Sequence, residues 1–413
     1  KIEHDFIKNN QKSNYENTPA PKKNFFVKIK NILNILMVKL NIINKEIFFY
    51  DTGLKTFFEK KCELMVNKSL SFWQLPLNKI SNTINYELRK KISLDLNSVN
   101  NFELFLKQNI SIILPRFLIE DYKSINQLLN NLKLPKNPKA IVTGMGYANE
   151  IFNIYTAKMV SKKTKFITLQ HGNISDSHYW HDFIIESGFQ DLKLTWGIKS
   201  NKRQLPLFNF KTINSKIAAS KNGNLSIVCN NYYSRPHPFE LNLENILSDT
   251  IDLIKNIDNK INEKTYFKLF PGDFNNTNEF FKKILNNSNL KYYQDRINYH
   301  QMLEKSRITI FNYESSGFFE NLALNLPCCY YSTNAYEDIK DDYKKFYKNL
   351  EMNKILFTSK SKIISHIFNI WDNVEDWWFS ENVQKSIEYF NSNLNIPYNK
   401  NQNKLINILK EQV

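Results

Sequence analysis

The sequence has little glycine, proline and cysteine. Its 413 residues include 9 Gly, 12 Pro and 4 Cys, which excludes collagen-like and low-complexity chains. The cysteines show no CxxC spacing, and Cys328 and Cys329 are adjacent within an apolar run, which predicts that they belong to the core. We therefore expect neither a disulfide framework nor a zinc site, and the sequence fits a reducing compartment.

Long apolar runs are also lacking. The most apolar early segment, 25–49, is interrupted by charges that include Lys28, Lys30 and Lys39, so it does not span a bilayer. It can lie on a membrane as a basic amphipathic helix, but packing on its own domain is the simpler interpretation. No signal peptide is visible. We expect a cytoplasmic protein, with peripheral contact at the inner face of the cytoplasmic membrane as an extension of that expectation.

Aromatic side chains, by contrast, are abundant. The chain has 31 Phe and 21 Tyr, and 42% of its residues are hydrophobic. This composition excludes a disordered chain, because disordered segments are poor in aromatic residues. A length of 413 residues suits two domains of roughly 150–200 residues, each with its own core.

Basic residues exceed acidic ones, 56 against 40, which gives a net charge of +16. The excess favours a polyanionic partner (nucleic acid, an anionic membrane or a phosphorylated substrate), or it simply solubilises the surface. No zinc finger, RNP1 or helix-turn-helix signature is present, so we expect no nucleic-acid partner. HExxH, GxSxG, GxGxxG and Walker A motifs are absent as well. We therefore expect no metal and no dinucleotide cofactor, and neither protease nor esterase activity.

From residue 139 onward, short apolar runs alternate with helical patterns. Runs at 140–146, 165–170 and 192–196 predict buried strands, and a helix is expected at 149–161. After a polar linker the pattern restarts. Strands are expected at 225–229, 266–270, 307–311 and 328–331, and helices at 243–257, 318–325, 363–371 and 382–390. Strand–helix–strand order with short loops is typical of parallel α/β sheets.

The earlier part of the chain has a different pattern. Segment 25–135 is predicted to be mostly helical, with 110–114 either a short strand or the end of a helix. The linker is expected to cover 200–204 and 211–224. Two α/β units joined in this way form a cleft, and ligands of such sheets bind where strands end and helices begin.

Two candidate catalytic residues follow strands of the first unit. His171, in Gln170-His171-Gly172, ends a buried strand and can bind an anion or move a proton, or it can simply satisfy loop carbonyls. Glu150 lies in the first turn of the next helix. It can act as general base toward an acceptor hydroxyl, or it can complement the helix dipole.

A strand-to-helix turn of the second unit carries hydroxyl groups. In 313–320, Tyr313, Ser315 and Ser316 precede a helix whose N-terminus can hold a phosphate, and Glu320 can bind a ribose hydroxyl. The alternative is a Ser N-cap with a downstream acid, and both can hold at once.

Other basic groups are expected near the same edge. Lys268 precedes Pro271-Gly272-Asp273 and can neutralise a phosphate, whereas the Pro-Gly pair alone is enough for a turn. Arg235 and His237, in Arg-Pro-His-Pro, can meet an anionic donor or lie in a proline-stiffened loop.

At these motifs the sequence resembles a family of bacterial transferases from surface-polysaccharide loci. The resemblance spans roughly 110–392, and four ordered segments carry it, namely 150–157 with 169–172, 186–197, 313–327, and 377–390 with its Trp377-Trp378 pair. A further similar segment lies upstream, at 114–120. Single motifs are weak, but four in order are fairly specific.

The resemblance implies a GT-B fold, and similarity to transferases of Kdo and nonulosonic acids that use CMP-activated donors. It implies that Glu150 is the base, that His171 and Arg235 bind the donor carboxylate or phosphate, that Ser315 and Ser316 hold the nucleotide phosphate, and that Glu320 lies near the ribose. Related enzymes often carry a Lys-x-His-Pro element. Here residues 268–271 read Lys-Leu-Phe-Pro, so His237 either replaces that histidine or the phosphate is held otherwise. The glycine-rich segment expected after the His-Gly pair is also missing.

The fold expected from this resemblance is α/β, with two Rossmann-like domains facing a central cleft. Its expected parts are a flexible arm at 1–24, an N-terminal acceptor-side domain with a helical extension at 25–205, a C-terminal nucleotide-sugar-binding domain at 206–375, and closing helices at 376–413 that cross back. Trp377 and Trp378 are expected to pack those helices against the first domain.

The predicted function is transfer of a sugar in surface-glycan biosynthesis. The expected donor is a CMP-linked acidic sugar of the Kdo or nonulosonate type, and the expected acceptor is a glycan or a lipid-linked glycan. No cofactor beyond the donor substrate is expected. Two alternatives remain open: a non-catalytic protein that binds nucleotide sugars or glycans, and a transferase of the glycerophosphate-polymer type.

Overall fold

The computed structural model of the chain describes residues 46–70, 75–76, 83–95, 100–132, 134–172, 176–179, 189–228, 248, 250–253, 255–269, 282–283, 285–286, 290–293, 297–398 and 402–412. The N-terminal arm, the basic segment up to residue 45, Cys229, Arg235, His237 and 271–273 lie outside these described residues.

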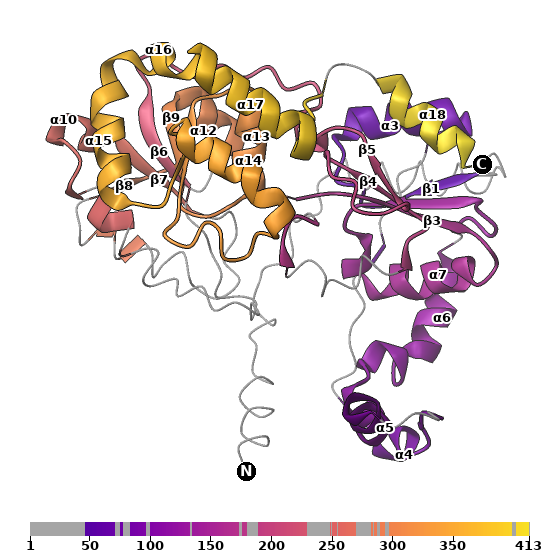
Figure 1. Cartoon of the computed structure of the whole chain (residues 1–413). Coiled ribbons are helices and arrows are strands. Elements are labelled where there is room, and N and C mark those ends of the chain that lie inside the picture. The colour runs from indigo at the N-terminus through magenta and orange to yellow at the C-terminus, as the bar shows by residue number, and fades with distance from the viewer. Residues whose placement is uncertain are drawn as a thin grey trace.

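The first α/β unit contains a parallel five-stranded sheet (Figure 1). Its strands, in spatial order, are β1 (Ile47–Phe49), β2 (Ala140–Thr143), β3 (Lys165–Leu169), β4 (Leu192–Thr195) and β5 (Gln204–Pro206). Registers such as Phe48 opposite Ile141 and Ile141 opposite Phe166 bring all the carboxyl ends to one edge.

Helices cover both faces of this sheet. The helical elements of this unit are α3 (Thr56–Asn67), α4 (Tyr86–Arg89), α5 (Asn101–Ile113), η1 (Arg116–Leu118), α6 (Tyr122–Asn131), η2 (Gly146–Ala148), α7 (Glu150–Val160) and α18 (Gln402–Glu411), of which α4 and α5 lie away from the sheet. Alternate strand residues point to opposite faces. Ile47 and Val142 therefore join the core that includes residues of α3 and α18, whereas Phe48 and Ile141 join the core beside α6 and α7.

The second unit contains a parallel six-stranded sheet. Its strands, in spatial order, are β11 (Leu356–Phe357), β10 (Cys328–Tyr331), β9 (Ser306–Phe311), β6 (Asn224–Val228), β7 (Thr265–Lys268) and β8 (Lys291–Tyr292). The strand order reverses between β9 and β6, and such a switch point is where doubly wound sheets bind ligands. The loop that leaves β9 carries Tyr313, Glu314 and Ser315.

The second sheet is also covered on both faces. Its helical elements are α10 (Asn259–Asn262), α12 (Tyr299–Lys305), α13 (Ser316–Ala323), α14 (Asp341–Met352), α15 (Lys360–Ile370), η5 (Trp371–Asn373), α16 (Val374–Trp378) and α17 (Glu381–Leu394), and η4 (Phe210–Thr212) lies in the segment between the two sheets. Cys328 and Cys329 are fully buried on opposite faces of β10, as expected of core residues. Burial raises the pKa of both thiols.

The two units share a continuous core. Trp196, just beyond β4, lies 6.2 Å from the ring of Phe319 in α13, and both belong to the cluster that runs from α3 to α17. Asn395, which follows α17, forms a bridge with Gly197 in the first unit, and α18 packs on α3. A Cβ on Gly197 would lie 2.6 Å from the carbonyl carbon of Leu394, so this crossing needs a glycine.

Two tryptophans lie differently from the expectation. Trp378 donates from Nε1 to the side-chain oxygen of Asn325 at the end of α13, and Trp377 packs edge-on against His366 of α15. Helices α16 and α17 therefore rest on the second unit, and α18 is the closing helix that packs on the first.

The predicted architecture of two Rossmann-like α/β units is confirmed. Because Gly172, after β3, lies against Ser316, after β9, the two carboxyl edges meet, and this is the GT-B arrangement. Segment 110–114 is the end of α5 rather than a strand. The sequence prediction missed β1, which lies within a segment expected to be helical, and β5, which begins in the expected linker.

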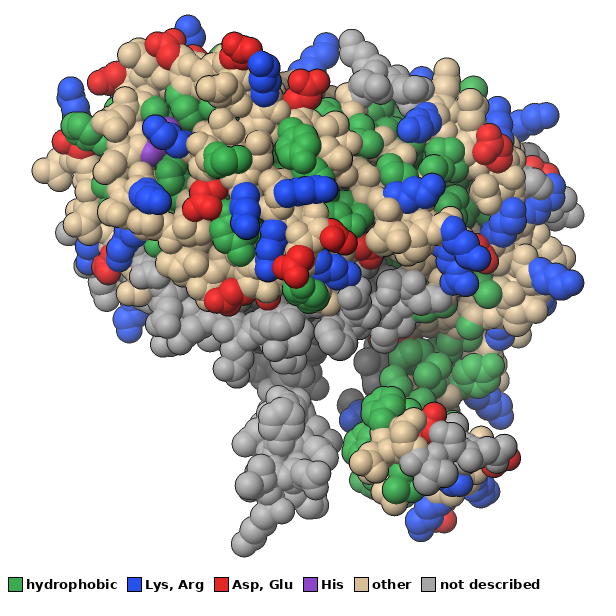
Figure 2. Space-filling view, in the orientation of Figure 1, with side chains coloured by type: hydrophobic (Ala, Val, Ile, Leu, Met, Phe, Trp, Pro, Cys, Tyr) green, Lys and Arg blue, Asp and Glu red, His purple; other side chains and the backbone are tan. Residues whose placement is uncertain are grey.

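Helices α4 and α5 project from the first unit, and apolar side chains gather on them (Figure 2). α5 contributes no buried residue. Arg89 of α4 holds this extension together: it makes a bidentate contact with Glu120 and also donates to carbonyl oxygens at the end of α5. The Arg89 guanidinium lowers the pKa of Glu120 to about 2.

Candidate functional site

The carboxyl edges of the two sheets meet near β3 and β9. Gly172, just beyond β3, lies so close to α13 that a Cβ on it would be 3.2 Å from the hydroxyl oxygen of Ser316. Lys55, the N-cap residue of α3, donates from Nζ to Ser215 of the segment between the sheets, at 2.7 Å. Residues that follow strands of both units therefore lie around one site.

The loop that follows β1 crosses over the end of β2. The carbonyl oxygen of Asp51 accepts hydrogen bonds from the backbone N–H groups of Gly144 and Met145, both at 2.9 Å. A Cβ on Gly144 would lie 2.4 Å from the carbonyl oxygen of Thr52, so the crossing requires glycine there. Asp51 has φ 43° and Gly53 has φ 71°, both in the left-handed region that tight turns use.

This crossing carries Asp51 to His171. A Cβ on Gly53 would lie 3.8 Å from the Cβ of His171, although β1 and β3 are separated by β2. Burial raises the pKa of Asp51, the charges of His171 and Lys211 lower it, and Glu59 raises it, with a net upward shift. Among the residues that the structure describes, none donates a hydrogen bond to this carboxylate. The Asp51 carboxylate is thus held close to two basic side chains without a hydrogen-bond donor among the described residues.

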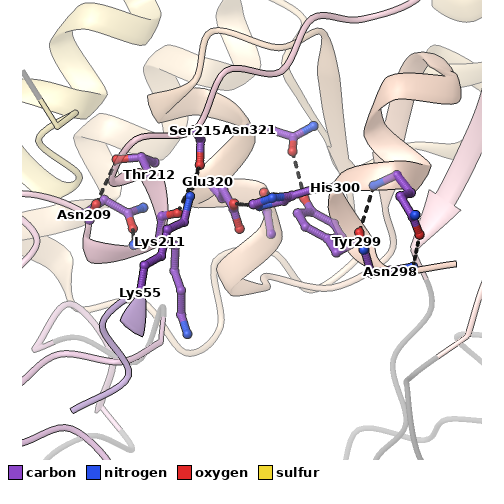
Figure 3. A network of polar contacts seen from close by, with 12 residues as sticks. Lys55, Asn209, Lys211, Thr212, Ser215, Asn298, Tyr299, His300, Glu320 and Asn321 are labelled. Carbon is purple, nitrogen blue, oxygen red and sulfur yellow. Dashed lines mark hydrogen bonds and ion pairs between the residues drawn. The ribbon is translucent and has the colours of Figure 1, made fainter. Parts of the chain in front are cut away.

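Two lysines approach the site from different parts of the chain (Figure 3). Lys211 lies in η4, whose N-cap Asn209 accepts from the Lys211 backbone N–H and donates to Asn395. Burial lowers the pKa of Lys55, and the charge of Glu320 opposes this. Figure 3 shows the amino group of Lys55 directed at Ser215 and the Lys211 side chain extending away from this contact. Both amino groups can neutralise an anionic ligand.

In the second unit, the loop after β9 begins α13. Ser315 is the N-cap and accepts from the backbone N–H of Phe318 at 3.2 Å, and Ser316 is the first helical residue. A Cβ on Gly317 would lie 2.7 Å from the Tyr299 hydroxyl oxygen, which lies 2.8 Å from Asn321 Oδ1 and 2.9 Å from the Gly317 carbonyl oxygen. Ser315 therefore acts as the capping residue, while Ser316 faces Gly172.

Glu320 lies one turn further along α13. Its carboxylate contacts His300 Nε2 at 2.7 Å, and its side chain is 8% exposed against 38% for His300. His300 stands in the first turn of α12, which begins with a capping box between Asn298 and Gln301. The Glu320–His300 pair thus brings an imidazole to this edge, a contribution that the sequence did not predict.

Side chains that connect the two units lie beside the site. His178 of the segment that follows β3 contacts Glu314 at 2.9 Å, and Tyr347 donates to the other oxygen of Glu314 at 2.8 Å. The backbone N–H of Lys340 donates to the carbonyl of Ser177. Burial opposes the charged form of His178, but the charge and hydrogen bond of Glu314, together with the charge of Asp338, outweigh it, so the pKa of His178 is raised.

The other predicted residues are less closely grouped. Lys268 is buried and donates from Nζ to the Ile297 carbonyl at 2.8 Å. Tyr313 packs against the core at the end of β9. Glu150 is half-buried at the start of α7, after the N-cap Asn149. Arg235 and His237 fall outside the described residues.

Asp51, Lys55 and Lys211 were missed by the sequence analysis. A signal for Asp51 was present: the apolar run Ile47-Phe48-Phe49-Tyr50 ends in Asp51-Thr52-Gly53, which is typical of a short buried strand followed by a turn. No comparable signal marks Lys211 within a lysine-rich linker. In the part of the chain that the structure describes, no group of His, Cys, Asp or Glu is arranged to hold a metal ion.

A family model described as "LIC12162 family transferase" matches residues 1–410. No curated protein matches the chain. Among solved structures, HepE of Anabaena in complex with UDP-glucose has 10% identity and a TM-score of 0.43, over 89% of this chain and 99% of that one. The wall teichoic acid polymerase TagF has 12% identity and a TM-score of 0.41, over 95% and 98%. The spinosyn rhamnosyltransferase SpnG has 9% identity and a TM-score of 0.38, over 70% and 77%.

Proposed function

Because the chain belongs to the LIC12162 family of transferases, we propose that it is a glycosyltransferase of surface-glycan biosynthesis. It moves a sugar from a nucleotide-linked donor to a glycan or lipid-linked acceptor. The observation that carries this proposal is the meeting of the two carboxyl edges, with Gly172 against Ser316. A donor held there contacts both units at once, as transfer from one bound molecule to another requires.

The second unit supplies groups suited to the nucleotide. The first-turn N–H groups of α13 and the hydroxyl of Ser316 can bind a phosphate at the positive end of the helix dipole. The Glu320 carboxylate, which His300 orients, can accept a hydrogen bond from a ribose hydroxyl. Lys55 and Lys211 add positive charge from the first unit and the linker. This charge suits the proposed donor, a CMP-linked acidic sugar, which bears a carboxylate as well as phosphate.

A thermal-shift screen of CMP, UDP, GDP and CDP tests the nucleotide. A ligand that binds the native state alone stabilises it by about 2.7 kcal/mol at 100 times its Kd. We expect CMP to raise the melting temperature most, and no shift with CMP would contradict the acidic-sugar donor. Ser316→Ala is the matched variant, in which the shift should shrink.

Release of nucleotide from a panel of donors then separates the competing functions. Release that depends on added acceptor glycan supports a glycosyltransferase. Release from CDP-glycerol alone would point to glycerophosphate transfer. Binding without release from any donor would indicate a non-catalytic binding protein.

We also propose peripheral contact with a membrane, on the basis of the net charge and of helix α5. The net charge is +16, and Phe102, Phe105 and Ile112 are 67%, 51% and 72% exposed. Apolar side chains beside exposed lysines such as Lys107 suit an anionic membrane surface. Within the described residues, no helix has the length and apolar character needed to cross a bilayer. Co-sedimentation with phosphatidylglycerol vesicles, but not with phosphatidylcholine vesicles, is expected, and Phe102→Ser with Phe105→Ser should weaken it.

A further inference from the structure

The carboxyl edge of the first sheet holds a carboxylate that is separate from Glu150. Asp51 reaches the end of β3 because its loop crosses β2 over Gly144, and both of the backbone hydrogen bonds at that crossing end on the Asp51 carbonyl. Thr52 is anchored in turn by donating to Glu59 in the first turn of α3. The backbone that carries Asp51 is thus fixed from two sides, although the residue is on the surface.

We propose that Asp51 is the catalytic base, and that the nearby charges of His171 and Lys211 stabilise its carboxylate; this rests on the proposed glycosyltransferase function. The three residues come from the end of β1, the end of β3 and η4, so the tertiary fold rather than local sequence brings them together. Glu150, by contrast, occupies the first turn of α7, where a carboxylate stabilises a helix by complementing its dipole.

The proposed step is a single displacement. The Asp51 carboxylate takes the proton of the acceptor hydroxyl as the acceptor oxygen forms a bond to the anomeric carbon of the donor. The bond between that carbon and the phosphate oxygen breaks, and its electron pair stays on the phosphate of the departing nucleotide. Asp51 ends protonated and returns the proton to water. Lys55 and Lys211 offset the charge that develops on the leaving phosphate.

Two amide variants compare the carboxylates directly. In Asp51→Asn we expect kcat to fall roughly 10²- to 10⁴-fold, the range for loss of a general base, while the nucleotide thermal shift stays. In Glu150→Gln we expect turnover within about threefold of wild type. Formate added to Asp51→Ala should restore part of the rate, because a small carboxylate can take the place of the missing base.

The pH profile distinguishes a base from a merely structural residue. The groups facing Asp51 are His171, Lys211, Glu59 and the adjacent Tyr50. Activity of the wild type should fall at acidic pH as Asp51 takes up a proton. In Lys211→Met this fall should begin at higher pH, because loss of a nearby cation raises the pKa of a carboxyl group. In Asp51→Asn the residual rate should lack the acidic limb.

The outcomes separate the inference from the function on which it rests. An active wild type whose Asp51→Asn variant turns over normally, or keeps the acidic limb, overturns the role of Asp51 and leaves the glycosyltransferase standing. Loss of turnover in Glu150→Gln alone does the same and returns the role to Glu150. No transfer by the wild type from any donor overturns both.

Discussion

In the second unit, the polar residues at the carboxyl edge already have partners. Ser315 caps α13, Glu320 contacts His300, and Glu314 is held by both His178 and Tyr347. At the edge of the first unit, Asp51 and the neighbouring Lys211 of the linker differ from these residues. The carboxylate of Asp51 and the amino group of Lys211 have no hydrogen-bond partner among the described residues, and act on one another through charge.

The two edges are therefore suited to different tasks. Buried polar groups that are fully paired hold a rigid geometry, which suits the binding of a nucleotide whose shape does not change during transfer. A carboxylate with a raised pKa and no fixed partner can change its protonation, as an acceptor-side base must. Substitutions at the second edge should mainly cost stability, and substitutions at the first should mainly cost turnover.

The largest loss of stability is expected from His178→Ala. Glu314 would keep Tyr347 as its partner but lose the imidazole, in a place where the two paired side chains are 6% and 9% exposed. Removing one member of a buried pair costs about 3 kcal/mol. Urea unfolding at pH 6 measures this loss of stability, with Lys107→Ala, a substitution at an exposed residue, as the control. If His178→Ala costs no more than the control, the His178–Glu314 pair does not stabilise the second edge.

The same pair predicts a pH dependence. The pKa of His178 is raised in the folded protein, so the folded state binds its proton more tightly than the unfolded state does. The stabilisation is fully present below the unfolded value of about 6.5, and it is lost as pH rises through the folded pKa. Asp338 adds to the shift and Lys340 opposes it. The urea midpoint of His178→Gln should decline less with rising pH than that of wild type. If the two midpoints decline equally, His178 and Glu314 do not form a charged pair.

A smaller loss is expected at the cap of α13. Ser315→Ala removes the side-chain acceptor for the Phe318 N–H and should cost about 1 kcal/mol, whereas Ser315→Gly should cost only a few tenths of that. The two variants differ in capping ability and both lose the hydroxyl. A midpoint for Ser315→Ala equal to that of wild type would mean that the hydroxyl does not cap the helix.

The second edge was largely predictable from sequence, and the first was not. A buried run of 306–311 followed by serines and a helical pattern specifies a strand, a turn and a cap locally. The position of Asp51 depends on a strand of three residues in a segment that the sequence predicts to be helical. It also depends on a crossing that Gly144, far along the chain, makes possible. The partners of Glu320 and Glu314 were likewise invisible, because His300, His178 and Tyr347 reach them through tertiary packing.

The smallest effect on stability is expected from Asp51→Asn, the same change that should most reduce turnover. Burial raises the pKa of Asp51, so the folded state binds its proton more tightly than the unfolded state, and the ionised group destabilises the fold as pH rises from about 4 through the folded pKa. Because the residue is also exposed to solvent, solvent screens part of this cost. An amide should therefore shift the free energy of unfolding by no more than about 0.5 kcal/mol, toward greater stability at pH 7. Unfolding midpoints at pH 5 and pH 7 test this. A clear loss of stability at both values would mean that Asp51 holds the loop together, and the fall in turnover would then be a structural consequence rather than the loss of a base.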